Sequence, residues 1–271
     1  MAQLERNAVV TQKVEVAPGL FIMRIAPVGW QLPPFKPGQF AVVGLPASAP
    51  RHPLCDLEEP ADNPDTWIRR SYTIASSSRE GEYIETYLTV VRSGSLSPRL
   101  AMLDVGDRLW LGRRVSGLFT FDEVPKTSDL VMIATGTGLA PYMSMLRSTL
   151  DETDDRRLAV IHGARHSWDL GYRGELLTME RLRPKLTYLP VVSRPTEEPV
   201  PWTGEVGYVQ DVWRRRALDA RWGHRPTPGG SHVFLCGNPG MIDTMVKILE
   251  GEGFREHTRL VPGQIHYEKY W

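Results

Sequence analysis

The sequence predicts a two-domain protein, with a β-rich first half followed by an α/β second half. Residues 8–120 contain short β-branched and aromatic runs separated by Pro, Gly and Ser clusters, a pattern typical of a barrel or a sandwich. From residue 130 onward, strand-like and helix-like stretches alternate, as they do in a parallel sheet with crossover helices. The length of 271 residues suits two domains or one large one.

Six strands are expected in the first half, and one long segment interrupts them. The strands are residues 8–16, 21–25, 39–45, 70–75, 83–91 and 108–112. Residues 46–67 break the pattern, because they are rich in Pro, Ala and acidic residues and contain Cys55. A loop of this length is usually either functional or mobile, and we interpret this one as a mobile surface insertion.

The strand around Arg70 carries residues that suit a phosphate and a flat ring. Alternate residues of a strand share a face, so Arg70 and Tyr72 point one way while Ser71 and Thr73 point the other. A guanidinium beside an aromatic ring can hold a phosphate and cover a ring system. The alternative is an edge strand with a solvated arginine and a half-buried tyrosine.

A second candidate anion site follows the fifth strand. Residues 93–100 indicate a turn into a short helix, with Ser97 as N-cap and Pro98 as the first helical residue. The alternative is a well-capped helix without a ligand.

The stretch 130–150 predicts a strand, a tight turn and a helix. An apolar run from residue 130 to 133 is broken by Gly136 and Gly138, and Pro141 stands at a first helical position. Such a turn brings bare backbone and a helix N-terminus close to a pyrophosphate. A Gly-x-Gly in this context is also often only a turn.

The rest of the second half continues the alternation. We expect strands at residues 157–162, 187–193 and 232–236, and helices at residues 173–183, 208–218 and 239–252. The strand ends at Ala134, Gly163, Ser193 and Cys236 should line one edge, where ligands of parallel sheets bind.

The residues after these strands indicate which nucleotide would bind. The second strand ends in His162-Gly163-Ala164-Arg165 and lacks the acid that holds a ribose 2′-hydroxyl in free-standing dehydrogenases. Arg165, Ser193 and Arg194 instead suit a polyphosphate or a 2′-phosphate, the alternative being solvated surface arginines. Cys236 is expected to serve packing, although Gly237 would let a ligand ring approach its thiol.

Composition excludes several classes of protein. Lys plus Arg equals Asp plus Glu at 32 each, so overall charge does not indicate nucleic acid or an anionic membrane as partner. No apolar run approaches the length of a membrane span, and the N-terminus lacks a signal-peptide core, so we expect a cytoplasmic protein. Two distant cysteines exclude a disulfide framework, a cysteine-rich zinc site and a four-thiolate iron–sulfur centre, and we expect no metal.

Taken together, these pieces resemble the ferredoxin–NADP(H) reductase family, most closely its single-chain bacterial branch. The resemblance covers nearly the whole chain. It is carried by five motifs in the family's order: Arg70-Ser71-Tyr72-Thr73, Gly94-Ser95-Leu96-Ser97, Gly136-Thr137-Gly138-Leu139-Ala140-Pro141, Cys236-Gly237 and the terminal Tyr270-Trp271. It implies an antiparallel FAD-binding β-barrel at residues 1–125. It also implies a parallel α/β NADP(H)-binding domain at residues 126–271, whose aromatic tail returns to the flavin.

The resemblance also assigns roles to individual residues. FAD contacts are expected from Arg70, Ser71, Tyr72, Thr73, Tyr87, Ser95, Leu96, Ser97, Thr137, Tyr270 and Trp271. NADP(H) contacts are expected from Gly136, Gly138, Ala164, Arg165, Ser193, Arg194, Cys236, Gly237, Asn238 and Pro239. The catalytic positions would be Thr73 near flavin N5, Cys236 and Glu268 beside the nicotinamide, and Tyr270 against the isoalloxazine.

The implied activity is that of a ferredoxin–NADP(+) reductase. A hydride would pass between the nicotinamide and FAD N5, and single electrons would be exchanged with a separate ferredoxin or flavodoxin. We expect a monomer whose carrier docks on Arg69, Arg99, Arg113 and Arg114. Glu205 departs from the family pattern, because a carboxylate there would repel a 2′-phosphate and weaken the preference for NADP(H) over NAD(H). The alternatives are an NADH-dependent oxygenase reductase and a non-catalytic electron-relay flavoprotein subunit.

Overall fold

The chain divides into two compact units. The computed structural model describes residues 5–59, 62–63, 65–149 and 155–269. Unit 1 consists of residues 1–120 and 140–150, and unit 2 consists of residues 121–139 and 151–271.

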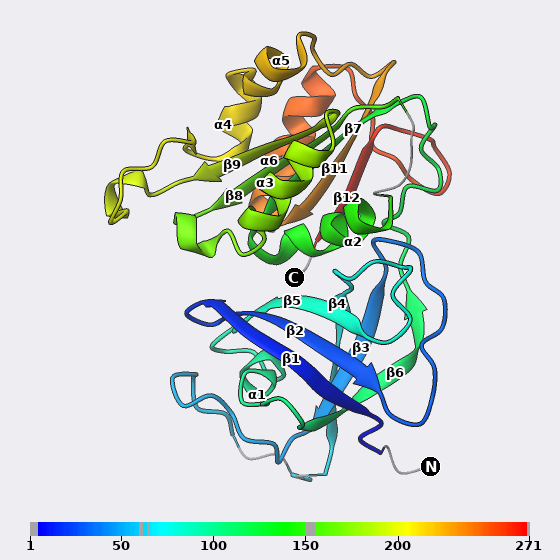
Figure 1. The fold of residues 1–271 in the computed structure, drawn as a ribbon, viewed down its shortest axis with the longest axis vertical. Helices are drawn as coiled ribbons and strands as arrows, with labels where there is room; N and C mark the ends of the chain where they lie inside the picture. The colour runs from blue at the N-terminus through cyan, green and yellow to red at the C-terminus, as the bar shows by residue number, and fades with distance from the viewer. Residues whose placement is uncertain (1–4, 60–61, 64, 150–154, 270–271) are drawn as a thin grey trace. The chain divides into compact units, whose positions relative to one another are not determined.

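Unit 1 is built on one antiparallel sheet, and all six expected strands are confirmed. They are β1 (Ala8–Ala17), β2 (Leu20–Pro27), β3 (Phe40–Pro46), β4 (Trp67–Thr73), β5 (Ile84–Thr89) and β6 (Arg108–Ser116). Their order is β4-β3-β6-β1-β2-β5, and each neighbouring pair is antiparallel (Figure 1). An isolated antiparallel bridge between Ile74 and Thr86 links the chain just after β4 to β5, the two strands at opposite ends of this order.

Alternation along the strands places the core of unit 1. In β3, Ala41, Val43 and Leu45 are each 1% exposed and share one face of the strand. Val42 and Gly44, which alternate with them, lie on the opposite face. Two short helices complete the unit: α1 (Ser97–Leu100) and α2 (Ala140–Ser148). Arg147 of α2 donates to the buried carboxylate of Glu85 on β5 at 2.6 Å, which ties this helix to the sheet.

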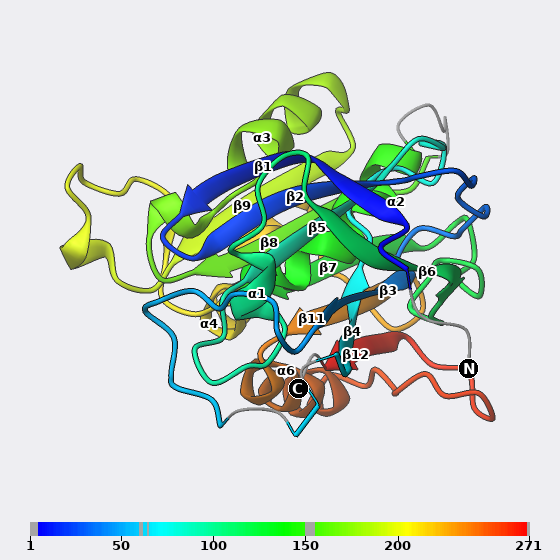
Figure 2. The ribbon, with the colours of Figure 1, turned by 90° about the horizontal axis from the view of Figure 1, so that it is seen from below.

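Unit 2 is built on one parallel sheet with helices on both faces. Its strands are β7 (Asp129–Thr135), β8 (Leu158–Ala164), β9 (Leu186–Val192), β10 (Glu205–Val206), β11 (Ser231–Gly237) and β12 (Ile265–Lys269). Their order is β10-β9-β8-β7-β11-β12. The helices are α3 (Arg173–Leu182), α4 (Val209–Arg214), α5 (Ala217–Trp222) and α6 (Pro239–Gly251). Figures 1 and 2 show α3 on one face of this sheet and α4 and α6 on the other.

Three features of unit 2 differ from the prediction. The single helix expected at residues 208–218 is two helices, because Arg216 has a φ of 60° in the left-handed region and breaks the first one. β10 was not predicted, since it has only two residues. The segment Ile265–Lys269 forms an edge strand parallel to β11.

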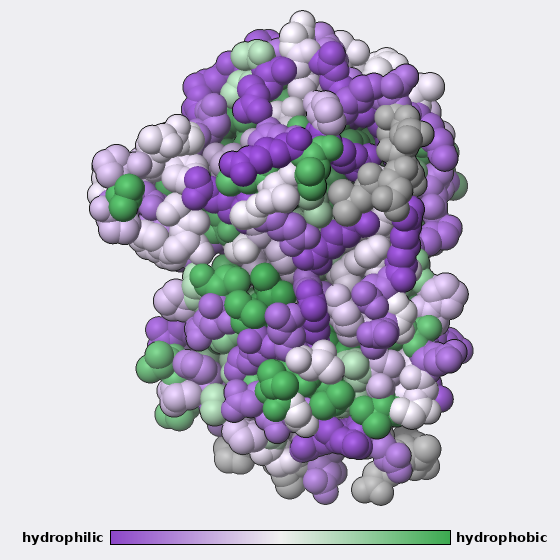
Figure 3. Space-filling view, in the orientation of Figure 1, coloured by the Kyte–Doolittle hydropathy of each residue, from purple (hydrophilic) through white to green (hydrophobic). Residues whose placement is uncertain are grey.

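Among the described residues, no helix has the length and apolarity needed to cross a membrane. Hydrophilic and hydrophobic residues are intermixed over the face drawn in Figure 3.

Candidate functional site

The carboxyl ends of four parallel strands meet at one edge of the unit 2 sheet, as predicted. Cys236 is in register with Ala134, and Ala134 is in register with His162. On the next strand along, Ala164 is in register with Val192. The residues that follow these strands therefore come together, at the edge where parallel sheets bind ligands.

Two glycines allow the turn after β7 to touch the end of β11. A Cβ at Gly138 would lie 2.3 Å from the Cys236 carbonyl oxygen and 2.5 Å from its carbonyl carbon. Gly237 has a φ of 127°, and a Cβ there would lie 2.4 Å from Thr135 Oγ1. The Asn238 N–H donates to the same Thr135 hydroxyl at 2.9 Å. The two segments thus meet backbone to backbone, which side chains at either glycine would prevent.

The geometry of this turn corrects one expectation. Gly136–Leu139, including Thr137, forms a 3₁₀ turn, and the α-helix begins only at Ala140. Pro141 is therefore the second helical residue. The 3₁₀ turn that contains the two glycines therefore lies between β7 and the helix, and this turn contacts β11.

Cys236 and Glu268 are neighbours across the last two strands. They are in register in the parallel pair β11 and β12, so their side chains project from the same face of the sheet. Cys236 is fully buried. Glu268 Oε2 is buried without a hydrogen-bond partner among the described residues, and burial raises the pKa of this carboxyl to about 7. An orphaned carboxyl oxygen at a strand end suits a ligand N–H, such as that of a carboxamide.

Glu268 should make stability depend on pH. Between pH 4.5 and about 7 the folded carboxyl keeps a proton that the unfolded chain releases, so the free energy of unfolding falls as pH rises through this window. The maximum effect is about 3 kcal/mol. In urea unfolding of the apoprotein, the free energy of unfolding of Glu268→Gln minus that of wild type should be larger at pH 8 than at pH 5. A wild-type-minus-variant difference that is constant with pH would contradict the buried, protonated carboxyl.

The experiment compares wild type with the variant because a second residue, His266, makes the free energy of unfolding change with pH in the opposite direction. Burial lowers the pKa of His266 to about 3, so its contribution to stability is lost as pH falls below 6.5. This contribution is common to both proteins and cancels in the comparison.

The predicted phosphate residues of unit 2 are brought together by backbone hydrogen bonds. The Ser193 N–H donates to Ala164 O, and the Arg194 N–H donates to Arg165 O, both at 3.0 Å. Both arginines are exposed. Arg194 lies 3.5 Å from Glu197, a solvent-exposed pair that contributes little to stability and leaves the guanidinium available to a ligand. Asn238 caps α6 by accepting from the Met241 N–H, with Pro239 as the first helical residue.

Glu205 is paired, which the sequence did not indicate. Arg215 donates to the Glu205 carboxylate at 3.1 Å and to the Val206 carbonyl at 2.9 Å. Glu205 is in register with Val191, two residues before Ser193. The predicted repulsion of a 2′-phosphate by Glu205 is therefore opposed by the positive charge of Arg215.

In unit 1, the predicted residues Arg70 and Tyr72 lie on β4. The Arg70 guanidinium is exposed, and among the described residues its only acceptor is the Arg69 carbonyl, at 2.8 Å. Burial raises the pKa of the Tyr72 phenol, and the nearby Arg70 charge opposes this rise. Thr73 is buried and Ser71 is exposed. A half-buried ring beside a guanidinium that has no carboxylate partner among the described residues suits a ring system that carries a phosphate.

The turn before α1 is capped differently from the prediction. Leu96, not Ser97, is the N-cap, and Ser97 and Pro98 are the first two helical residues. The Ser97 hydroxyl accepts from the Val91 N–H at 3.0 Å, so it holds the turn closed instead of capping the helix. Ser95 is half-buried, and Leu96, Ser97 and Tyr87 are buried.

Two more expectations have different outcomes. Arg99, predicted as a docking residue, is only 5% exposed and bonded to carbonyls, so it cannot contact a carrier. Tyr270 and Trp271 lie outside the described residues.

Arg215, which the sequence analysis missed, is separated from Glu205 by ten residues and a helix, and no local pattern signals the pair.

Comparisons with known proteins cover both units. The sequence model of the oxidoreductase NAD-binding domain matches residues 132–247. The chain is 34% identical over 241 residues to flavodoxin/ferredoxin–NADP reductase of Escherichia coli, covering 88% of each chain. It is 29% identical over 246 residues to ferredoxin–NADP reductase of Azotobacter vinelandii, covering 87% of this chain and 86% of that protein.

The fold has a solved counterpart over the same length. The structure superposes on a ferredoxin NADP+ reductase from Neisseria gonorrhoeae, solved with bound FAD and NADP, with a TM-score of 0.81. The two chains are 22% identical, and the match covers 97% of this chain and 98% of the other.

Proposed function

The chain belongs to the flavodoxin/ferredoxin–NADP reductase family, and from this premise we propose that it is an FAD-dependent oxidoreductase that exchanges electrons between NADP(H) and a small electron-carrier protein. The observation that carries this proposal is the match to the E. coli reductase, which extends over 88% of both proteins. A relative that matched the nucleotide-binding region alone would support only nucleotide binding.

The residues present fit both cofactors. Arg70 has an exposed guanidinium, bonded only to the Arg69 carbonyl among the described residues, for the FAD pyrophosphate, and Tyr72 offers a ring beside it. Glu268 has an unpartnered buried oxygen among the described residues, and Gly237 lets the end of β11 lie against Thr135 at the same sheet edge. We assign FAD to unit 1 with Thr73, Tyr87 and the turn 95–97, and NADP(H) to unit 2. The domain boundary at residue 125 and the parts of Thr137, Tyr270 and Trp271 in holding FAD stay predictions.

FAD, when bound, supplies the chemistry that converts two-electron hydride transfer into single-electron transfer. The protein's own contribution is binding, orientation and proton placement. Arg70 would supply positive charge to a pyrophosphate, while Arg165 and Arg194 would supply positive charge, and Ser193 a hydroxyl donor, to a 2′-phosphate. Glu268 can hold a proton on Oε2 near neutral pH and so can either donate to or accept from a carboxamide.

The carrier, a ferredoxin or flavodoxin, is proposed to dock on the exposed arginines of β4 and β6. Gly44 of β3 pairs with Arg69 on one side and Trp110 on the other, and its missing side chain lets the Arg69 guanidinium lie 5.8 Å from the Trp110 ring. Arg113 lies 5.4 Å from the Trp30 ring. Arg114 beside it is also exposed. Guanidiniums held over rings form an ordered positive surface that suits an acidic protein.

The experiment is NADPH-dependent reduction of cytochrome c through added ferredoxin or flavodoxin. The double variant Arg113→Glu/Arg114→Glu should lower the carrier-dependent rate about tenfold at low salt and less at high salt. Reduction of the bound flavin by NADPH should be unchanged. Arg108→Glu, at the other end of the same strand, is the matched control and should have little effect. A carrier-dependent rate that resists charge reversal would remove this docking surface, and a rate that needs no carrier would contradict the proposed partner.

A further inference from the structure

The first part of the insertion between β3 and β4 is held against the turn that precedes α1. We call residues 47–59 the insertion arm and residues 92–98, which include the first two residues of α1, the turn. The His52 N–H donates to Pro98 O at 3.0 Å, and the Asp56 N–H donates to Arg92 O at 3.1 Å. The expectation of a mobile insertion is therefore wrong for this arm, which is hydrogen-bonded to one of the predicted FAD-binding elements.

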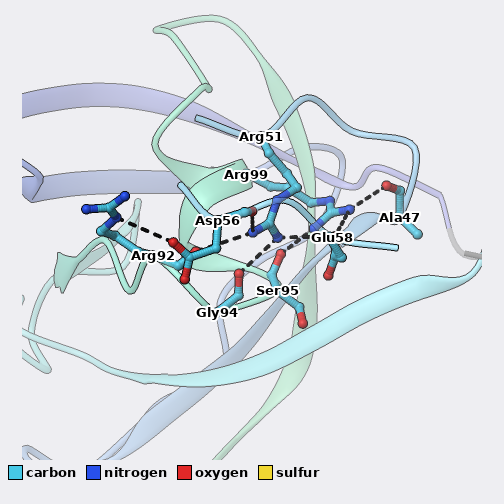
Figure 4. A network of polar contacts seen from close by, with 8 residues as sticks. All are labelled: Ala47, Arg51, Asp56, Glu58, Arg92, Gly94, Ser95 and Arg99. Atoms are coloured by element: carbon cyan, nitrogen blue, oxygen red, sulfur yellow. Dashed lines mark hydrogen bonds and ion pairs between the residues drawn. The ribbon is translucent and has the colours of Figure 1, made fainter. Parts of the chain in front are cut away.

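Arg51 of the arm fixes one carbonyl of the turn. Its guanidinium donates to Gly94 O at 3.0 Å and to the Glu58 carboxylate at 3.1 Å (Figure 4). The second terminal nitrogen donates to Asp56 O at 3.0 Å. Arg51 thus joins two points of the arm to the turn.

Arg99 of α1 fixes the next carbonyl from the other side. Its guanidinium donates to Ser95 O at 2.6 Å and to Ala47 O at 2.7 Å. It also donates to Glu58 at 2.7 Å, so one carboxylate bridges the two arginines (Figure 4). The Arg99 hydrogen bond, with further help from Arg51 and the Ser95 hydroxyl, holds the pKa of Glu58 below its usual range. Because Arg99 is buried, removal of Glu58 would leave part of its charge unpaired.

The direction of these carbonyls determines what the turn offers to a ligand. In a planar trans peptide the C=O and the following N–H point in opposite directions. Since Gly94 O and Ser95 O face the guanidiniums, the N–H groups of Ser95 and Leu96 face away from them. In the described part of the chain neither N–H has a hydrogen-bond acceptor. Successive free N–H groups of this kind bind anions.

We propose that Arg51 and Glu58 are positioning residues for FAD: by holding the turn through its carbonyls, the insertion arm aims the Ser95 and Leu96 N–H groups at the FAD pyrophosphate and so controls how tightly FAD is held. The inference rests on the proposed function, because it takes FAD as the ligand of unit 1. It gives the insertion a role in cofactor retention.

The test compares three variants of the arm for binding of FAD and of riboflavin. Arg51→Ala removes the bond to Gly94 O, and Glu58→Gln keeps an acceptor but removes the bridging charge. Asp56→Asn is the matched control, since among the described residues the Asp56 side chain pairs only with the exposed Arg92, at 3.6 Å, and the backbone bonds of Asp56 survive. Riboflavin shares the ring and ribityl chain of FAD and lacks the pyrophosphate, so it separates aiming of the turn from general loosening of the unit.

We expect Arg51→Ala to raise the Kd for FAD about tenfold, and Glu58→Gln to raise it about threefold, with faster FAD release measured by flavin fluorescence. Asp56→Asn should stay within about twofold of wild type. The Kd for riboflavin should be unchanged in all three. Arg51→Lys, which keeps the charge but not the forked donor, should be intermediate and serves if the alanine variant fails to fold.

Two results would overturn the inference while leaving the proposed function intact. One is wild-type FAD affinity in both Arg51→Ala and Glu58→Gln. The other is an equal loss of FAD and riboflavin affinity, which would indicate a purely structural role. If wild-type protein itself binds no FAD, the proposed function fails first, and the two failures are therefore distinguishable.

Discussion

Replacing Gly138 with alanine is expected to slow NADPH-driven reduction of the bound flavin by at least about 100-fold while FAD remains bound. The added Cβ would lie 2.3 Å from the Cys236 carbonyl oxygen, 2.5 Å from its carbonyl carbon and 2.7 Å from Gly237 N. All three contacts are with backbone, so no side-chain rotation relieves them. The turn must move away from β11 and take the proposed nicotinamide-binding backbone with it.

Stopped-flow absorbance of the flavin measures this effect directly. The variant should keep the flavin spectrum and be bleached normally by dithionite, because most of the proposed FAD residues lie in unit 1. Gly174→Ala is the matched control, since Gly174 lies in α3 and, apart from its chain neighbours and the helix backbone, no atom lies within 4 Å of its added Cβ. Unimpaired reduction of Gly138→Ala by NADPH would show that contact between this turn and β11 does not position the nucleotide.

Replacing Arg215 with alanine is expected to lower the preference for NADPH over NADH, expressed as the ratio of the two kcat/KM values, about tenfold. In the wild type, Arg215 neutralises Glu205 at 3.1 Å. Without it, an unpaired carboxylate stands on β10, next to the strand β9 that Ser193 follows. This charge opposes a 2′-phosphate, which NADPH carries and NADH does not.

A double variant separates charge from structure in this prediction. Glu205→Gln/Arg215→Ala should recover most of the lost preference, because the repelling charge is gone. Arg214→Ala is the control, since Arg214 pairs with Asp211, at 3.3 Å, whereas Arg215 pairs with Glu205. An Arg215→Ala protein with unchanged preference would place Glu205 outside the reach of the nucleotide.

The features that could be predicted from sequence are those that local pattern determines. The strand before Gly136 and the strand before Cys236 are apolar runs of the right length, and parallel pairing then makes their ends meet. Close contact between Gly138 and Gly237 follows from residues that lack a Cβ. Sequence reasoning could therefore locate the edge at which these strand ends meet, and the nucleotide-binding role of the residues there stays a prediction.

The features that could not be predicted depend on contacts between distant segments. From its local sequence Arg99 is expected at the surface. Its burial is explained by the hydrogen bond to Glu58, which lies 41 residues earlier in the chain. Arg215 reaches Glu205 because α4 ends just before the left-handed Arg216, and an arginine in that conformation leaves no signal in composition or periodicity. Ser97 satisfies the capping pattern but bonds to Val91 instead.

The most direct test of the central claim is an anaerobic titration of the purified FAD-loaded protein with NADPH and NADH in parallel, following bleaching of the flavin. We predict rapid, stoichiometric reduction by NADPH and slower reduction by NADH, since Arg165, Ser193 and Arg194 lie together as the proposed 2′-phosphate residues and Glu205 is paired with Arg215. Faster reduction by NADH than by NADPH, or a flavin that neither nucleotide reduces, would contradict it.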